Sequence, residues 1–259
     1  MDTSVPHPAR RYNYWLGGKD HFAADRESGD LLVKAFPTAR IAARENRDFL
    51  RRSVRFLAES GVRQFLDVGT GLPVPDNTHE IAQRIAPESR VLYVDNDPIV
   101  MTHSRALTVG TPEGRTGYVE ADLRDPESII GDPELRAVLD LREPVALLLV
   151  AVLHFLHDDD QAAAVVARLL AALPSGSYLV ASNLTLDHAP PAQVAKHEEL
   201  LASGRTDARA RNLSEFGRFF AELDVVDPGI VAVSDWRPER SDQPTPTDVA
   251  IYGAVGRKA

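Results

Sequence analysis

Residues 65–73 read Phe65-Leu66-Asp67-Val68-Gly69-Thr70-Gly71-Leu72-Pro73. The apolar run before Gly69 predicts a short strand at 64–68 that is covered on both faces, as in a parallel sheet. Gly69 and Gly71 allow positive φ angles and leave space for a ligand against the backbone. A helical segment follows at 78–85. This order of strand, glycine turn and helix predicts an α/β sheet that binds a nucleotide-like ligand at the carboxyl ends of its strands.

The composition restricts the classes of protein that fit. A chain of 259 residues suits one large α/β domain, and the absence of cysteine excludes disulfides, thiolate metal sites and cysteine nucleophiles. The net charge of −9 argues against binding along a nucleic-acid backbone. No apolar run approaches the ~20 residues of a membrane span, and no signal-peptide pattern precedes the first helix. We therefore expect a cytoplasmic protein that binds neither nucleic acid nor membrane, with its oligomeric state left open.

Strands and helices alternate along most of the chain, which predicts a Rossmann-like, doubly wound, mostly parallel sheet. The predicted parallel strands lie at 64–68, 91–95, 116–121, 145–152 and 178–182. Two later apolar runs, 224–233 and 248–255, show no helix between them and are expected to pair antiparallel. Helical patterns at 24–34 and 38–60 precede the sheet, after a Pro-rich segment at 1–10 that we expect to be mobile. We predict one domain, in which 61–259 form the sheet unit and 1–60 an N-terminal helical extension or lid.

The turn itself discriminates between two classes of ligand. Dinucleotide enzymes favour G-x-G-x-x-G, but here Gly69 and Gly71 are followed by Val74 in place of a third glycine. Asp67 at the strand end is poorly placed for two phosphates and well placed for a cationic group. A ligand with an ammonium, a sulfonium and a ribose therefore fits better than a dinucleotide.

Two further acids end the next two strands. Asp95 can accept hydrogen bonds from both hydroxyls of a ribose. Asp122, beside the backbone N–H of Leu123, is placed to recognise the amino edge of an adenine. Because the carboxyl ends of parallel strands meet at one edge, Asp67, Asp95 and Asp122 are expected to form one carboxylate rim.

These motifs resemble those of the class I S-adenosylmethionine-dependent methyltransferases. More narrowly, Arg11-Tyr-Asn-Tyr-Trp-Leu-Gly-Gly-Lys-Asp-His-Phe-Ala-Ala-Asp-Arg26 resembles the opening of an actinobacterial S-adenosyl methyltransferase family, once called DUF574. The segments 67–73, 94–98, 153–156 and 235–238 agree with that family as well. The resemblance implies a seven-stranded sheet whose last strand is antiparallel and lies beside the fifth.

The resemblance also implies the cofactor, S-adenosylmethionine, with S-adenosylhomocysteine as its product. Asp67 and the glycine turn then face the methionine end, Asp95 the ribose, and Asp122 with Leu123 the adenine. The family leaves the substrate open. The predicted cofactor-binding residues are Tyr14, Gly17, Gly18, Lys19, Asp67, Gly69, Thr70, Gly71, Asp95, Asn96, Asp122, Leu123 and Ala151.

Two residues are candidates for a catalytic role. His154 follows the strand at 145–152, where it serves either as a proton acceptor or as a packed histidine. A metal held by His154 and His157 is the weaker interpretation, since Asp158 and its neighbours suit the N-terminus of the next helix. Tyr14 lies among N-terminal aromatic residues that either form a lid over the cofactor or cover the sheet edge. The segment 205–211 is either a solvated loop or an anion clamp.

The sequence thus predicts a transferase: an S-adenosylmethionine-dependent methyltransferase acting on oxygen or nitrogen of a small molecule. The alternative is a non-catalytic protein that senses the cofactor or presents a surface to a partner. A nicotinamide oxidoreductase ranks third, because Val74 and Asp67 do not suit a dinucleotide. Nucleic acid is disfavoured as a substrate because 150–154 lacks the Asn/Asp-Pro-Pro-aromatic motif of base-methylating enzymes.

Overall fold

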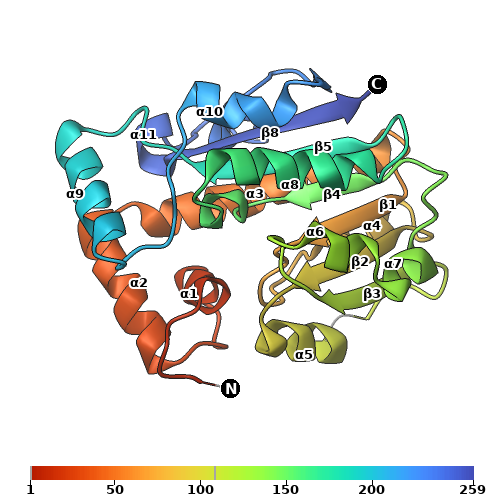
Figure 1. The fold of residues 1–259 in the computed structure, drawn as a ribbon, viewed down its shortest axis with the longest axis horizontal. Coiled ribbons are helices and arrows are strands. Elements are labelled where there is room, and N and C mark those ends of the chain that lie inside the picture. Colours follow the sequence, from red (N-terminus) through yellow and green to blue (C-terminus); the bar gives the residue numbers. More distant parts are fainter. Residues whose placement is uncertain (1, 108) are drawn as a thin grey trace.

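One mixed sheet organises the chain in this computed structural model, which describes residues 2–107 and 109–259. Its strand order is β3-β2-β1-β4-β5-β8-β6, with β7 paired to β8 (Figure 1). The strands are β1 (Gln64–Val68), β2 (Arg90–Asp95), β3 (Arg115–Glu120), β4 (Ala146–Leu149), β5 (Tyr178–Leu184), β6 (Leu223–Val225), β7 (Val231–Ala232) and β8 (Ile251–Lys258).

The pairing pattern confirms the predicted sheet. Strands β1 to β5 pair in parallel, and β8 runs antiparallel between β5 and β6. The sheet has eight strands where seven were expected, because Pro228 and Gly229 divide the run at 224–233 into β6 and β7. Both of these short strands pair with β8, as the sequence predicted for the two last apolar runs.

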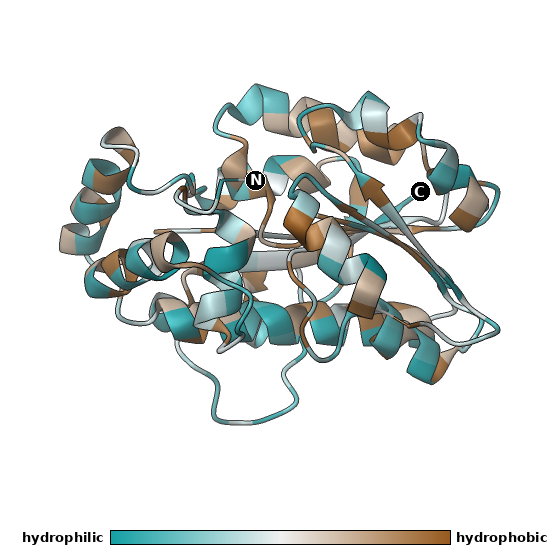
Figure 2. Cartoon of the chain, turned by 90° about the horizontal axis from the view of Figure 1, so that it is seen from below, coloured by the Kyte–Doolittle hydropathy of each residue, from teal (hydrophilic) through white to brown (hydrophobic). Residues whose placement is uncertain are grey.

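Helices cover both faces of the sheet. They are α1 (Pro8–Trp15), α2 (Ala23–Ala35), α3 (Ala39–Glu59), α4 (Thr78–Ile85), α5 (Pro98–Leu107), α6 (Pro126–Ile130), α7 (Pro133–Val138), α8 (Asp159–Ala171), α9 (Pro191–Ala202), α10 (Leu213–Gly217) and α11 (Pro246–Val249). Three short 3-10 turns accompany them: η1 (Leu153–Phe155), η2 (Arg218–Phe220) and η3 (Val233–Asp235). Hydrophilic and hydrophobic residues alternate around these helices, as expected for a layer between core and solvent (Figure 2).

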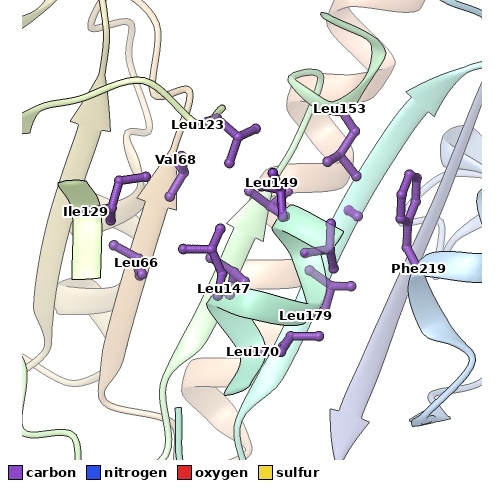
Figure 3. Packing of buried hydrophobic residues seen from close by; sticks show 14 of the residues in the cluster. Leu66, Val68, Leu123, Ile129, Leu147, Leu149, Leu153, Leu170, Leu179 and Phe219 are labelled. Atoms are coloured by element: carbon purple, nitrogen blue, oxygen red, sulfur yellow. The ribbon is translucent and has the colours of Figure 1, made fainter. Parts of the chain in front are cut away.

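Two apolar cores separate the helical layers from the sheet. On one face, Phe49 and Leu57 of α3 pack with Phe65 of β1. On the other face, Leu66 and Leu147 pack with residues of α8 (Figure 3). Successive residues of β1 thus enter opposite cores, which is why the strand reads as a continuous apolar run. The helix predicted at 38–60 is α3, and it ends before Gly61, whose φ is 94°.

Helices α1, α2 and α9 lie together at the end of the sheet toward which the parallel strands point (Figure 1). This places the N-terminal segment over the strand ends, while α3 belongs to the layer that covers the sheet. The predicted division at residue 60 stays a prediction. No helix within the described residues has the length and apolar character needed to cross a membrane.

One predicted strand boundary was wrong. Strand β4 ends at Leu149 rather than at 152, because Ala151 adopts a positive φ of 55° that ends the extended backbone. Helix α10 is capped by Asn212, which accepts from the backbone N–H of Glu215. Helix α1 begins at Pro8, within the Pro-rich segment.

Candidate functional site

A cavity of about 580 Å³ opens at the carboxyl ends of the parallel strands. One half lies over β1, β2 and β3 and is lined by the glycine turn and the carboxylate rim. The other half lies over β4 and β5 and is enclosed by residues of α2, α3 and α9. Ligands of open α/β sheets bind where neighbouring strands lead in opposite directions along the sheet, which here is between β1 and β4.

The glycine turn has its shape for two separate reasons. Gly69 and Gly71 have φ angles of 79° and 68°, a conformation that other residues rarely adopt. A Cβ atom on Gly69 would lie 2.6 Å from Cγ2 of Val152, so the turn also packs directly against the segment after β4. The backbone N–H groups of Gly69 and Thr70 donate to the Val94 carbonyl oxygen, which fixes the turn to the end of β2.

Two carboxylates of the rim are buried in this half of the cavity. Asp67 accepts a hydrogen bond of 2.6 Å from Thr78 Oγ1, and burial raises its pKa to about 6. Asp95 accepts from the backbone N–H groups of Gly71 and Asp97, each at 2.9 Å, and burial raises its pKa as well. A raised pKa means that burial disfavours the ionised form of each carboxylate, which a bound cation would stabilise. The pair therefore suits a ligand with a positive charge and hydroxyl donors.

The third carboxylate of the rim differs from the other two. Asp122 is partly exposed and holds Arg124, with the Arg124 side chain donating to both carboxylate oxygens. Asn96 Nδ2 donates to it as well, at 3.0 Å. The hydrogen bonds from Arg124 hold the pKa of Asp122 well below its ordinary range. Asp122, Asn96 and Leu123 all line the cavity, but the Asp122 charge already has a partner.

Sequence reasoning missed Arg47 at this end of the cavity. Its Nη2 donates to the Asp76 carbonyl oxygen at 2.7 Å, whereas its buried Nε has no hydrogen-bond partner among the described residues. The guanidinium group is close enough to Asp67 to oppose the rise of that pKa. Because α3 contains several arginines at similar helical positions, the sequence carries no signal that distinguishes Arg47.

A hydrogen-bonded chain ties the N-terminal helix to the sheet below the cavity. Tyr12 Oη donates to the Ala43 carbonyl oxygen and accepts from Asn46 Nδ2. Asn46 Oδ1 accepts from Ser182 Oγ at 2.6 Å. Ser182 Oγ in turn accepts from the backbone N–H of Ala151. These hydrogen bonds fix α1 and α3 relative to the segment after β4. In that segment Ala151 has a positive φ and lines the cavity.

Helical periodicity decides which residues of the N-terminal motif line the cavity and which do not. Tyr12 and Trp15 are three positions apart on α1 and both line the cavity. Tyr14 is not among the lining residues: its hydroxyl donates to Asp30, and Arg40 lies 4.8 Å from its ring centroid. Gly17, Gly18 and Lys19 do not line the cavity either. Gly17, with a φ of 83°, and Gly18, packed on Asn13, form the turn that ends α1.

His154 faces the boundary between the two halves of the cavity. It lies in η1, directly after β4, and its ring Nδ1 is buried without a partner among the described residues. Burial lowers its pKa to about 4, so the ring is neutral near pH 7. A neutral histidine with a free ring nitrogen can take up a proton from a bound molecule.

Two arginines hold the turn that carries His154. Arg211 is 1% exposed and donates to the carbonyl oxygens of Leu153 and Leu156, on both sides of His154. The backbone N–H of Arg209 donates to the His154 carbonyl oxygen at 2.7 Å. Both side chains also pair with Asp159. Arg209 and Arg211 thus support the turn that carries His154. This structural role differs from both roles considered for 205–211, a solvated loop and an anion clamp.

The acidic run after His154 has the structural role that the sequence favoured. Asp158 accepts from the backbone N–H of Gln161 and caps α8. His157 Nε2 bonds to the Asp207 carbonyl oxygen at 2.7 Å. Across residues 2–107 and 109–259, the structure has no group of three or more side chains arranged to hold a metal ion.

Comparison with known proteins adds to this geometry. A family model described as S-adenosyl methyltransferase matches residues 1–259. A crystal structure of a DUF574 family protein from Streptomyces avermitilis is 50% identical, with a TM-score of 0.94, and the match covers 100% of this chain and 99% of that one. A putative methyltransferase from Thermobifida fusca is 42% identical, with a TM-score of 0.90, and the match covers 99% and 96% of the two chains.

A more distant structure shares the fold alone. Human N-acetylserotonin methyltransferase, solved in complex with SAM, is 14% identical, with a TM-score of 0.52, and the match covers 99% of this chain and 63% of that one. No curated protein matches this chain in sequence.

Proposed function

Since this chain belongs to the S-adenosyl methyltransferase family, we propose that its cavity transfers the methyl group of S-adenosylmethionine to an oxygen or nitrogen atom of a small molecule. Dependence on S-adenosylmethionine follows from the family, and the nature of the acceptor is our proposal. The observation that carries it is the pair of buried carboxylates, Asp67 and Asp95, on either side of the glycine turn. The cavity continues from them past His154 into an enclosed space.

The residues of the rim fit the parts of the cofactor in order. Asp67 would hold the ammonium of the methionine end, with Arg47 at its carboxylate. Asp95 would accept the ribose hydroxyls, and Leu123 with Asp122 would flank the adenine. The raised pKa of Asp67 supports this placement, because a bound ammonium would stabilise the ionised carboxylate that burial disfavours.

The bound cofactor supplies a methyl group on a positively charged sulfur. Transfer from such a centre requires alignment and exclusion of water more than strong acid–base help. We assign alignment to the segment 150–152, which packs on Gly69. Helices α1 and α2 exclude water at the mouth. His154 accepts the proton that leaves the acceptor atom, since its ring is neutral and Nδ1 has no other partner.

Titration calorimetry tests this function. The purified protein should bind S-adenosylhomocysteine and not NADH. Incubation with labelled S-adenosylmethionine and fractions of a cell extract should then yield a labelled small molecule. Binding without any labelled product would favour the non-catalytic sensor, and binding of NADH alone would contradict the proposal.

The setting of the reaction stays a prediction in two respects. The relatives from Streptomyces and Thermobifida support an actinobacterial origin. A cytoplasmic location and a small-molecule partner rather than nucleic acid remain as the sequence predicts them.

A further inference from the structure

The half of the cavity over β4, β5 and β8 has its own chemistry. Apolar side chains dominate its lining, and we call this space the chamber. Its lining includes Leu32, Phe36, Leu50, Leu184, Leu186 and Ile251. These residues come from α2, α3, the end of β5 and the start of β8. Such a lining favours a ligand with a largely apolar body.

Two histidines interrupt this apolar lining. His154 follows β4, beside the cofactor half, and His197 belongs to α9, with its ring 5.9 Å from that of Phe36. Each has a buried ring nitrogen, Nδ1 of His154 and Nε2 of His197, without a partner among the described residues. The two rings are near enough for the charge of one to lower the pKa of the other. A buried polar atom without a partner is costly, which indicates that a ligand supplies the missing hydrogen bond.

The hydrogen bond at its other nitrogen fixes what His197 can recognise. Burial lowers the pKa of His197, and a hydrogen bond with the Ala208 backbone opposes this shift. The Ala208 N–H already donates to Thr206 Oγ1, so the ring N–H at Nδ1 donates to the Ala208 carbonyl oxygen. Nε2 of the neutral ring then carries a lone pair, which accepts a hydrogen bond and cannot donate one.

The charged groups that line the chamber are already engaged. Asp207 pairs with Arg11, with Nη2 and Oδ1 2.7 Å apart. Asp248 accepts from the hydroxyl and the backbone N–H of Thr245, the residue that caps α11. A charged ligand would lose its hydration on entering this mainly apolar space, and desolvation opposes that.

We propose that the chamber binds an uncharged, mainly apolar molecule with two hydrogen-bond-donating groups, a hydroxyl at His154 and a second O–H or N–H at His197. This inference rests on the proposed methyl transfer and adds its substrate class. The hydroxyl at His154 is the acceptor: its oxygen forms the new bond to the methyl carbon as the carbon–sulfur bond breaks. The electron pair of that bond stays on sulfur, and the hydroxyl proton goes to Nδ1 of His154 and then to water. His197 determines specificity by requiring the second donor.

Naphthalene derivatives are suitable probes for this arrangement. Binding of 2-naphthol is compared with binding of the 1,5-, 2,6- and 2,7-dihydroxynaphthalenes by equilibrium dialysis, with the protein saturated with S-adenosylhomocysteine. The second hydrogen bond should make at least one diol bind about tenfold more tightly than 2-naphthol. The anion 6-hydroxy-2-naphthoate should bind at least about tenfold more weakly than 2-naphthol, because its charge lacks a partner.

Variants assign the difference to His197. His197→Leu should bind all diols as weakly as it binds 2-naphthol, and retained binding of S-adenosylhomocysteine should show that the variant is folded. His197→Gln keeps an acceptor oxygen and should restore part of the preference. His103→Leu, a change on α5 outside the cavity, is the matched control and should behave like the unmodified protein.

The outcomes separate the two proposals. If S-adenosylhomocysteine binds but no diol exceeds 2-naphthol, or if the preference survives in His197→Leu, the chamber proposal is overturned and the methyl-transfer function stands. If S-adenosylhomocysteine does not bind at all, the function fails and the chamber proposal fails with it.

Discussion

The two halves of the cavity differ in where their residues come from. The rim is built from residues that directly follow β1, β2 and β3, and their places follow from the topology of a parallel sheet. The chamber is built from α2, α3, α9 and the segments beside β5 and β8, which meet only when the helices pack. The topology of the sheet edge thus places the residues of the rim, while the packing of separate helices shapes the chamber.

The halves also differ in charge. Asp67 and Asp95 are buried acids, and burial raises the pKa of each. His154 and His197 are buried bases whose lowered pKa values report neutral rings. Burial disfavours the charged form of both kinds of side chain. Burial therefore makes the rim favour a cationic ligand and the chamber an uncharged one. The two ligands are thus distinguished by charge.

The largest effect on stability should come from Arg211, which holds the turn that carries His154 beside the chamber. Arg211→Met removes a buried guanidinium group that bonds to Leu153, Leu156 and Asp159. The abandoned carbonyl oxygens and carboxylate should lower the free energy of unfolding by about 3–5 kcal/mol. Urea denaturation measures this loss. Arg218→Met, which breaks a salt bridge between exposed side chains, should cost less than about 1 kcal/mol. Equal losses in the two variants would show that the turn does not depend on Arg211.

On the other side of the comparison, Asp95→Ala should weaken binding of S-adenosylhomocysteine about 100-fold or more. The ribose hydroxyls would lose a charged acceptor, and each such bond contributes about 1.5–3 kcal/mol. Glu120→Ala is the matched control, since Glu120 pairs with Asp95 in register but is exposed and outside the cavity. Calorimetry on both variants measures the difference. An unchanged affinity in Asp95→Ala would remove Asp95 from the ribose site.

The same comparison explains how far the sequence predicted the molecule. Strand β1 and helix α4 have the predicted bounds, because apolar runs, glycine turns and capping residues are local signals. Asp67, Asp95 and Asp122 all reach the cavity because strand ends share one edge. His197 and Arg47 lie on helices whose patterns specify a buried face but not a partner. Tyr12, and not Tyr14, lines the cavity, because the helical phase of α1 decides which tyrosine faces it and the composition of the segment does not reveal that phase.

The pH dependence of cofactor affinity sharpens the role of Asp67. Its pKa of about 6 in the free protein means that protons compete with a cationic ligand below that pH. The affinity for S-adenosylhomocysteine should be nearly constant above pH 7 and fall about tenfold between pH 7 and pH 5. Calorimetry across this range should also detect proton release on binding near pH 6. In Asp67→Asn the dependence should disappear; a fall that persists would assign it to another group.

The smallest effect should come from the third acid of the rim, Asp122. Its carboxylate holds Arg124 and accepts from Asn96, so its charge has a partner before any ligand arrives. Asp122→Asn keeps one acceptor oxygen, and the backbone N–H of Leu123 stays available to an adenine. We expect affinity for S-adenosylhomocysteine to fall no more than about threefold, well under 1 kcal/mol. Calorimetry beside Asp95→Ala tests this ranking. A loss as large as that of Asp95→Ala would mean that the ligand displaces Arg124 and takes the Asp122 charge for itself, and that burial does not rank the acids of the rim.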